Sequence, residues 1–229
     1  HDESPQVRTQ ALQALRYGRP DELLDDVMAR ATDRDPGVRT AALEVLASVD
    51  GENVDQALES LAQDESQPVR RGALQALAQR GRNAVLDDIV ATVRTATGTR
   101  LRLAIEDLIA AGYAGVVPAL LERLEVAPDD EKREYLRSAA LTGTPDAFAP
   151  LREAFLSSAP WAEADTALFA YLMANCRGAE ASVIALFQEL PRSDYRRRAL
   201  LIVQLANIAV DRDGSEASRQ IFDVLRTVL

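Results

Sequence analysis

Residues 33–46 read Asp33-Arg34-Asp35-Pro36-Gly37-Val38-Arg39-Thr40-Ala41-Ala42-Leu43-Glu44-Val45-Leu46, and the same pattern recurs on both sides of this stretch. Thirty-one residues earlier, the corresponding positions hold Asp2, Pro5, Val7, Arg8, Ala11, Leu12 and Leu15. Thirty-one residues later, they hold Asp64, Val69, Arg70, Ala73, Leu74 and Leu77, and proline is displaced by one position to Pro68. Self-similarity at a fixed period of this length is the signature of a solenoid of stacked helix pairs.

Each copy of the pattern has the features of one amphipathic helix. Pro36 stands where the first turn of a helix tolerates proline, because the backbone N–H at that position has no intrahelical partner. Val38, Ala42, Leu43 and Leu46 then follow at positions i, i+4, i+5 and i+8, which form one apolar stripe. The spacing therefore predicts a helix that begins at each proline and buries this stripe.

The pattern D-x-x-P-x-V-R-x-x-A-L-x-x-L resembles the second helix of HEAT repeats, especially the short bacterial kind found in bilin lyases and related proteins. In that family the Asp and the Arg form a ladder between neighbouring repeats. The resemblance implies this structural role for Asp33, Arg39, Asp64 and Arg70, and it extends the role to Asp2 and Arg8.

A second set of apolar positions lies between these helices and keeps the same period of 31 residues. Its members are Leu23, Val27 and Ala31; Val54, Leu58 and Ala62; Val85, Ile89 and Val93; Val116, Leu120 and Leu124; and Ala147, Leu151 and Phe155. With the resemblance, this predicts an all-α, right-handed α-solenoid (superhelix) of stacked antiparallel helix pairs. We expect a single domain over residues 1–229, with six full helix pairs and an unpaired helix at each end. The unpaired first helix suggests a part of a longer protein.

The last repeat recovers the motif in a helix that is apolar on most sides. Its spacing places Tyr195, Arg196, Ala199, Leu200 and Val203 at the motif positions. Because a helix that is apolar all round is buried somewhere, its extra face requires a cover. We expect the terminal helix, residues outside this chain, a second copy or a partner to provide it.

Composition and charge restrict the function. The net charge is −10 and the isoelectric point is near 4.7, which argues against wholesale nucleic-acid binding. Cys176 is the single cysteine, so no intrachain disulfide forms, and no apolar run approaches the length of a membrane span. The lone cysteine favours the cytoplasm, while a periplasmic or secreted location stays open if a signal segment has been removed.

The residues of common catalytic and metal sites are absent from the sequence. His1 is the only histidine, which removes Ser-His-Asp and Cys-His catalysis and histidine zinc sites, and there is no glycine-rich phosphate loop. The pairs Asp25-Asp26 and Asp87-Asp88 are best interpreted as part of a solvated outer face. We therefore expect a protein without catalytic residues, cofactor or metal.

The second helices of HEAT-like solenoids line the concave surface, so side chains that leave the core there are candidates for binding. Following the period along these helices gives Arg71, Gln75, Arg102, Glu106, Arg133, Arg137, Phe169 and Leu201. The predicted groove alternates Arg and Glu in the middle and becomes apolar towards the C-terminal end. An ordinary solvated surface with paired Arg and Glu side chains is the competing interpretation.

Three functions remain open after this reasoning. The leading hypothesis is a non-catalytic scaffold that binds a protein or peptide partner in the concave groove. The first alternative is a bilin-lyase-like, chromophore-handling protein, for which Cys176 without an internal histidine offers no evident chemistry. The second alternative is a nucleic-acid-binding domain like the HEAT-like DNA glycosylases, with Trp161 as the single tryptophan. Its basic strip would consist of Arg71, Arg102, Arg133, Arg137 and Arg197.

Overall fold

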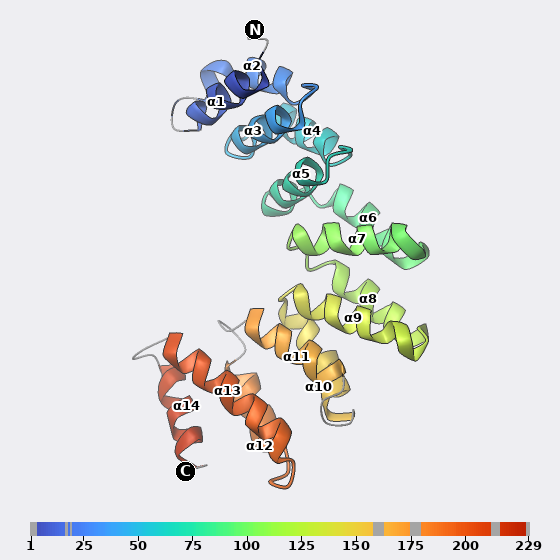
Figure 1. Cartoon of the computed structure of the whole chain (residues 1–229), viewed down its shortest axis with the longest axis vertical. Helices are drawn as coiled ribbons and strands as arrows, with labels where there is room; N and C mark the ends of the chain where they lie inside the picture. Colours follow the sequence, from blue (N-terminus) through green and yellow to red (C-terminus); the bar gives the residue numbers. More distant parts are fainter. Residues whose placement is uncertain are drawn as a thin grey trace. The chain divides into compact units, whose positions relative to one another are not determined.

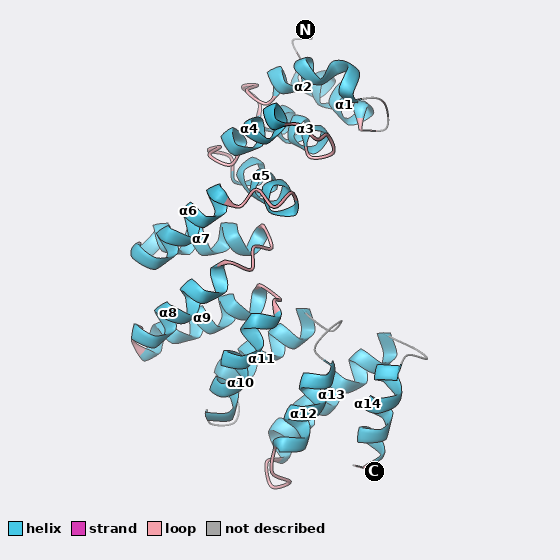
Figure 2. Cartoon of the chain, turned by 180° about the vertical axis from the view of Figure 1, so that it is seen from behind, coloured by secondary structure: helices cyan, strands magenta, loops and turns pink. Residues whose placement is uncertain are grey.

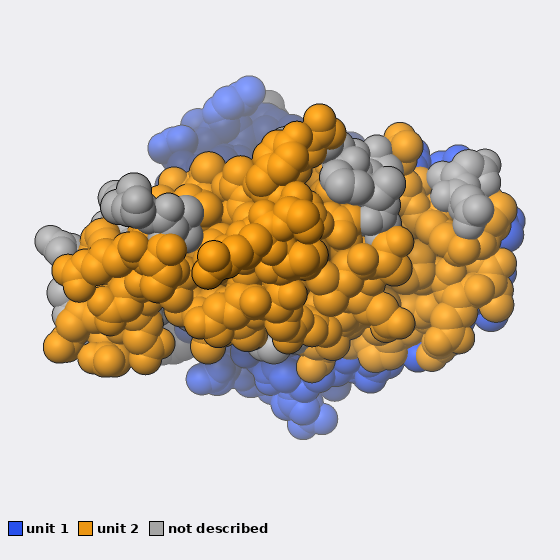
Figure 3. Space-filling view, turned by 90° about the horizontal axis from the view of Figure 1, so that it is seen from below, with its two compact units in different colours: residues 1–113 blue, residues 114–229 orange. Residues whose placement is uncertain are grey.

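The computed structural model describes residues 4–16, 18, 20–157, 163–174, 180–211 and 216–227. In these residues fourteen α-helices and two short 3₁₀ helices alternate with short loops, and Figure 2 shows no strand among them. The predicted all-α solenoid of helix pairs is confirmed. We expected one domain, and the chain divides into two compact units, residues 1–113 and residues 114–229, which Figure 3 shows in blue and orange.

The first unit contains the most regular repeats. Its elements are α1 (Pro5–Leu15), the 3₁₀ helix η1 (Pro20–Leu23), α2 (Leu24–Arg30), α3 (Pro36–Leu46), α4 (Glu52–Leu61), α5 (Gln67–Gln79), α6 (Ala84–Thr95) and α7 (Gly98–Ala110). The second-type helices α1, α3, α5 and α7 pack one against the next, and α2, α4 and α6 each pack against the second-type helix that follows (Figure 1). Each helix pair is thus one layer of the stack.

The beginnings of these helices follow from their sequences. The Asp35 carboxylate accepts hydrogen bonds from the N–H groups of Gly37 and Val38 at 2.8 and 3.2 Å, which caps α3, and Pro36 occupies its first turn. Past the end of α5, Gly81 has a φ of 68°, in the left-handed region where a side chain would be strained. Both features agree with the predicted repeat boundaries.

The core of the first unit consists of the periodic apolar positions. Their side chains are almost completely buried: Val38, Ala42, Leu43, Leu46, Val54, Leu58, Val69, Ala73, Leu74 and Leu77. Burying each large side chain contributes about 1.5–3 kcal/mol relative to leaving it in water. Because each helix buries this stripe against its neighbours, the period in the sequence becomes the stacking period of the helices.

The second unit continues the alternation of helices. Its elements are α8 (Val116–Val126), α9 (Asp129–Leu141), the 3₁₀ helix η2 (Pro145–Ala147), α10 (Phe148–Ser157), α11 (Glu163–Ala174), α12 (Glu180–Glu189), α13 (Tyr195–Asp211) and α14 (Glu216–Arg226). The second-type helices α9, α11 and α13 are neighbours, and α14 packs against both α12 and α13 (Figure 1). The terminal helix therefore provides part of the cover expected for α13.

The face of α13 that enters the core differs from the prediction. Arg197, Leu201, Gln204 and Leu205 are buried, whereas the motif positions predicted for the core, among them Tyr195 and Val203, are exposed. Apolar residues surround most of this helix, so its sequence does not define a single stripe. The packing of α12 and α14 selects the buried face instead.

Candidate interaction surface

An Asp–Arg ladder joins successive repeats of the first unit. The guanidinium of Arg8 donates from Nε and Nη2 to the two carboxylate oxygens of Asp33, at 2.9 and 2.8 Å. Arg39 donates in the same way to Asp64, at 2.7 and 2.8 Å. Each carboxylate also accepts from the backbone N–H two residues further on, at 3.0 and 2.8 Å. Such bidentate, charge-assisted pairs fix the geometry of neighbouring repeats.

The ladder shifts the pKa values of its members. The pKa of Asp33 is lowered, chiefly by the hydrogen bond from Arg8, which outweighs burial. Burial is the largest influence on Asp64 and would raise its pKa, but the bonds from Arg39 and a backbone N–H and the nearby positive charges together lower it. Both carboxylates are therefore held in the charged form that the arginines bind.

The third step of the ladder uses a carboxylate that the sequence reasoning missed. One period after Asp64 the chain has Thr95, which carries no charge. Arg70 donates instead to Asp107 on α7 at 2.7 Å, and Arg71 donates to the other oxygen of the same carboxylate at 2.8 Å. The absence of an acid at position 95 was the signal that Arg70 needed another partner.

A second ion cluster, also missed, lies where α4 and the end of α5 meet. Arg80 and Arg82 both donate to the buried carboxylate of Asp55, at 2.9 and 2.7 Å. Arg80 also donates to the carbonyl oxygen of Leu46 at 2.8 Å, at the C-terminal end of α3. A cation is favourable there, because the last carbonyl groups of a helix lack intrahelical partners. This cluster joins α3, α4 and the end of α5.

The predicted groove residues of the first unit neutralise one another. Arg71 and Arg102 both donate to Glu106, at 3.0 and 2.7 Å, while Gln75 is exposed. Arg71 is further held by Asp107. The result is a polar surface of paired charges, which provides little binding energy of its own.

The predicted groove residues of the second unit have mixed positions. Arg133 and Arg137 on α9 are exposed, and Phe169 on α11 is half-buried. Leu201 is only 2% exposed, so its assignment to a binding surface is wrong. Its side chain belongs to the buried face of α13, because the true register of that helix differs from the predicted one.

Large apolar side chains instead emerge at positions that the sequence reasoning did not select. Leu141 on α9 is 48% exposed, and Tyr195 and Val203 on α13 are 68% and 52% exposed. Arg196 lies over the ring of Tyr195 at 5.8 Å. We call this set, together with Arg137 and Phe169, the second-helix face of unit 2. Tyr195 and Val203 are eight residues apart on α13. The sequence would have shown that they are exposed only if the buried face of this helix had been assigned correctly.

Arg197, the last member of the proposed basic strip, is not on this face. It is buried, lies 3.7 Å from the carboxylate of Asp165 and stacks its guanidinium 5.1 Å from the centre of the Phe155 ring. With Arg71 and Arg102 also in ion pairs, the strip is not assembled as predicted. Arg197 instead ties α13 to α10 and α11.

The acidic pairs of the first helices are exposed, as expected for an outer face. Asp87 accepts a hydrogen bond from the hydroxyl of Tyr113 at 2.6 Å. Among the described residues no group of three or more His, Cys, Asp or Glu side chains could hold a metal ion, and none of their helices is long and apolar enough to cross a membrane. His1, Trp161 and Cys176 lie outside the described residues.

Stacked helix pairs joined by an Asp–Arg ladder define an α-helical repeat protein. Residues 1–78 match the family model of HEAT repeats, which confirms the resemblance to that family predicted from the sequence pattern. No curated protein matches the sequence. HEAT repeats generally serve as protein-interaction scaffolds, and HEAT-repeat proteins are typically non-enzymatic.

Proposed function

We propose that the protein is a non-catalytic scaffold that binds a protein or peptide partner on the second-helix face of unit 2. The observation that carries this proposal is the exposure of Leu141, Tyr195 and Val203 on helices of one row. Single exposed apolar residues are common on any protein. Here all three lie on second-type helices of one unit, Leu141 on α9 and Tyr195 and Val203 on α13.

The comparison with the first unit supports the same choice. There the exposed positions of the second-type helices α3, α5 and α7 are polar, for example Glu44, Gln75 and Arg102. Stacking of the repeats therefore does not require large apolar side chains at these positions. Aromatic and arginine side chains, such as Tyr195 with Arg196, are the types in which interfaces concentrate their binding energy.

The charges on this face suggest how a partner would be recognised. Arg137 and Arg196 flank the apolar side chains on α9 and α13, so acidic groups of a partner would find complementary charges there. Such pairs set orientation and association rate more than affinity. The apolar anchors would supply most of the affinity.

The test is a titration of a partner captured from the native extract against matched variants. Val203→Glu and Tyr195→Ala should each weaken binding by about 2 kcal/mol or more, which is roughly a 30-fold rise in Kd. Val126→Glu is the control, because Val126 is 81% exposed in the same unit but lies at the end of the first-type helix α8. Binding that is lost in Val126→Glu and kept in Val203→Glu would contradict the proposal.

A further inference from the structure

Two outer positions of the second-type helices have different residues in the two units. The first position is acidic or polar in the first unit and positively charged in the second; its members are Glu44, Gln75, Glu106 and Arg137. The second position is small or polar in the first unit and apolar in the second; its members are Ser48, Gln79, Ala110 and Leu141. Successive members of each set are 31 residues apart, so they are equivalent positions of successive repeats.

The carboxylates at the first of these positions neutralise arginines in the first unit. Glu44 accepts a hydrogen bond from Arg16 at 2.8 Å. Glu106 accepts hydrogen bonds from Arg71 and Arg102 at 3.0 and 2.7 Å. Because each of these arginines already has a carboxylate of its own chain beside it, it offers little attraction to an acidic ligand.

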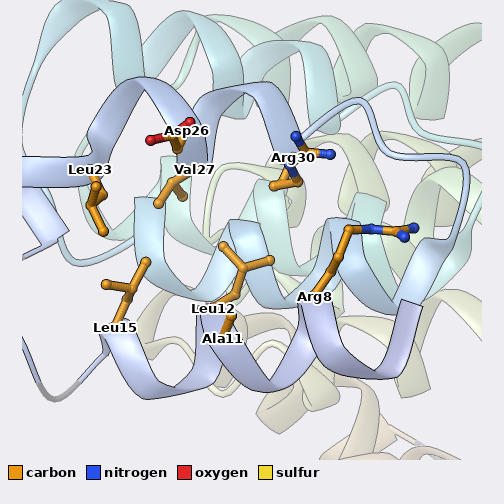
Figure 4. Close-up of a pocket in the computed structure, with 8 residues that line it drawn as sticks. All are labelled: Arg8, Ala11, Leu12, Leu15, Leu23, Asp26, Val27 and Arg30. Atoms are coloured by element: carbon orange, nitrogen blue, oxygen red, sulfur yellow. The ribbon is translucent and has the colours of Figure 1, made fainter. Parts of the chain in front are cut away.

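The arginines of the pocket between α1 and α2 are neutralised in the same way. Figure 4 shows Arg8 and Arg30 together at one end of this pocket. They lie 2.8 and 3.6 Å from the carboxylate oxygens of Asp33. Here too the first unit supplies the negative charge from its own sequence.

Arg137 on α9 of the second unit differs from these arginines. Its side chain is exposed, and it has no ion pair or hydrogen bond within the part of the chain that the structure describes. It stands one period after Glu106, and Arg133 stands one period after Arg102. The attractive pair of α7 is therefore replaced on α9 by like charges at i and i+4, which repel each other. A carboxylate brought by a partner would relieve this repulsion.

The neighbouring helices continue this surface. In the second unit α11 packs against both α9 and α13 (Figure 1). On α13, the exposed residues Tyr195, Ala199 and Val203 recur at i, i+4 and i+8 and form one stripe, and Arg196 lies over the ring of Tyr195. Of the side chains described on α11 and α13, no carboxylate is exposed. An acidic ligand would therefore meet no like charge on these two helices.

We propose that the partner of the second-helix face of unit 2 is an acidic peptide segment that carries large apolar side chains; this inference rests on the function proposed above. The carboxylates of the peptide would pair with Arg137 and Arg196. Its apolar side chains would contact Leu141, Tyr195 and Val203. The partner thus supplies the carboxylate that the first unit supplies from its own chain, and this charge complementarity selects and orients it.

A nucleic acid fits this surface less well than such a peptide. The protein has a net charge of −10, and Glu131 and Glu134 are exposed on α9 itself. A long polyanion would meet these carboxylates, whereas a short peptide can place single carboxylates beside the arginines. Leu141 and Val203 are aliphatic, whereas the bases of single strands stack on aromatic side chains.

The experiment selects ligands without assuming their charge. The complete chain is used to enrich short peptides from a displayed random library, and the Kd of the enriched peptides is measured by fluorescence anisotropy. We expect these peptides to combine Asp or Glu with large apolar residues. We also expect their affinity to fall when the NaCl concentration rises from about 0.05 M to about 0.5 M, because salt screens the charges. Enriched peptides that are neutral or basic would overturn the proposal.

Two variants give α9 the residues of the first unit, so both should fold as the parent does. Arg137→Glu introduces the glutamate found at Glu106 and should raise the Kd of the enriched peptides by about tenfold or more, because like charges then face each other. Leu141→Ala introduces the alanine found at Ala110 and should raise the Kd by about fivefold.

Arg219→Glu is the matched control for the charge reversal. It changes the net charge of the same unit by the same amount, at a side chain on α14 that is 71% exposed. It should change the Kd by less than about twofold, because an exposed charge away from the site contributes little. Equal effects of Arg137→Glu and Arg219→Glu would overturn the proposal, since the attraction would then depend on net charge alone.

The remaining outcomes separate this inference from the proposed function. If Tyr195→Ala and Val203→Glu weaken the binding of a captured partner and Arg137→Glu does not, the scaffold function stands and the acidic class of partner is wrong. If none of the three variants weakens the binding of any ligand, both proposals are wrong. If an oligothymidylate displaces the enriched peptides from the parent and fails to bind Arg137→Glu, the ligand is a nucleic acid and the peptide assignment is wrong.

Discussion

Arg39 lies on α3 and donates two hydrogen bonds, of 2.7 and 2.8 Å, to the carboxylate of Asp64, twenty-five residues further along the chain. The same guanidinium donates from Nη1 to the backbone carbonyl oxygen of Asp33 at 2.8 Å. Arg39 thus binds the turn before its own helix and the turn of the next repeat at once. The burial of both side chains makes this contact a structural joint and removes it from the surface that partners can reach.

Removing one partner of this pair should destabilise the first unit. Asp64→Asn removes the carboxylate that pairs with the buried guanidinium of Arg39 through two hydrogen bonds, which we expect to lower the free energy of unfolding by about 3 kcal/mol. Glu65→Gln is the control, because Glu65 lies 4.0 Å from the same arginine with a side chain that is fully in solvent, and it should change stability by less than about 0.5 kcal/mol. Urea titrations measure the free energy of unfolding of both variants. Equal losses would contradict the structural role of the Arg39–Asp64 pair.

The ladder should also make stability depend on acid pH. The folded pKa values of Asp33 and Asp64 lie below 3.8, so their contribution is fully present above that pH and is lost as the pH falls through the lowered values. Unfolding free energies between pH 5 and pH 2 should therefore fall more steeply for the parent than for Asp64→Asn. Parallel curves for the two proteins would show that Asp64 has no lowered pKa in the fold.

Tyr113 should ionise later than an ordinary tyrosine. Burial and its hydrogen bond to Asp87 raise the pKa of its hydroxyl from 10.0 to about 12. The fold prefers the protonated phenol, so this contribution is complete below pH 10 and is lost as the pH rises towards 12. The difference in phenolate absorbance between the parent and Tyr113→Phe measures the pKa. Asp87→Asn removes the negative charge beside the hydroxyl and should lower this pKa, and an unchanged value would show that Asp87 does not raise the pKa of Tyr113.

The buried glutamine of α13 should cost stability. Gln204 is completely buried, and among the described residues neither its amide oxygen nor its nitrogen has a hydrogen-bond partner. Gln204→Leu removes two unsatisfied polar groups at similar volume and should raise the free energy of unfolding by about 1–3 kcal/mol. Asn207→Leu, at an exposed position of the same helix, is the control and should be close to neutral. A loss of stability in Gln204→Leu would indicate a polar partner for Gln204.

The sequence by itself determined the repeat. The buried pairs Val38 and Val69, and Leu43 and Leu74, are each 31 residues apart. Side chains that must leave water at fixed intervals define both the helices and their stacking. The Asp–Arg ladder was predicted from Asp33, Arg39 and Asp64 through the family pattern, because both partners lie at constant distance in the chain.

Two features were decided only by the tertiary structure. One is the contact made where the 31-residue period is broken, and the other is the buried face of a helix that is apolar on most sides. Thr95 stands where the period would place an acid, and Asp107 provides the carboxylate that binds Arg70 instead. Asp107 lies on another helix, so only its distance in space identifies it as the partner. On α13, apolar residues surround the helix, so the packing of its neighbours buries Leu201 and leaves Val203 in solvent. A one-dimensional pattern specifies a helix face only where polar and apolar residues alternate clearly, and elsewhere the neighbouring helices choose the face.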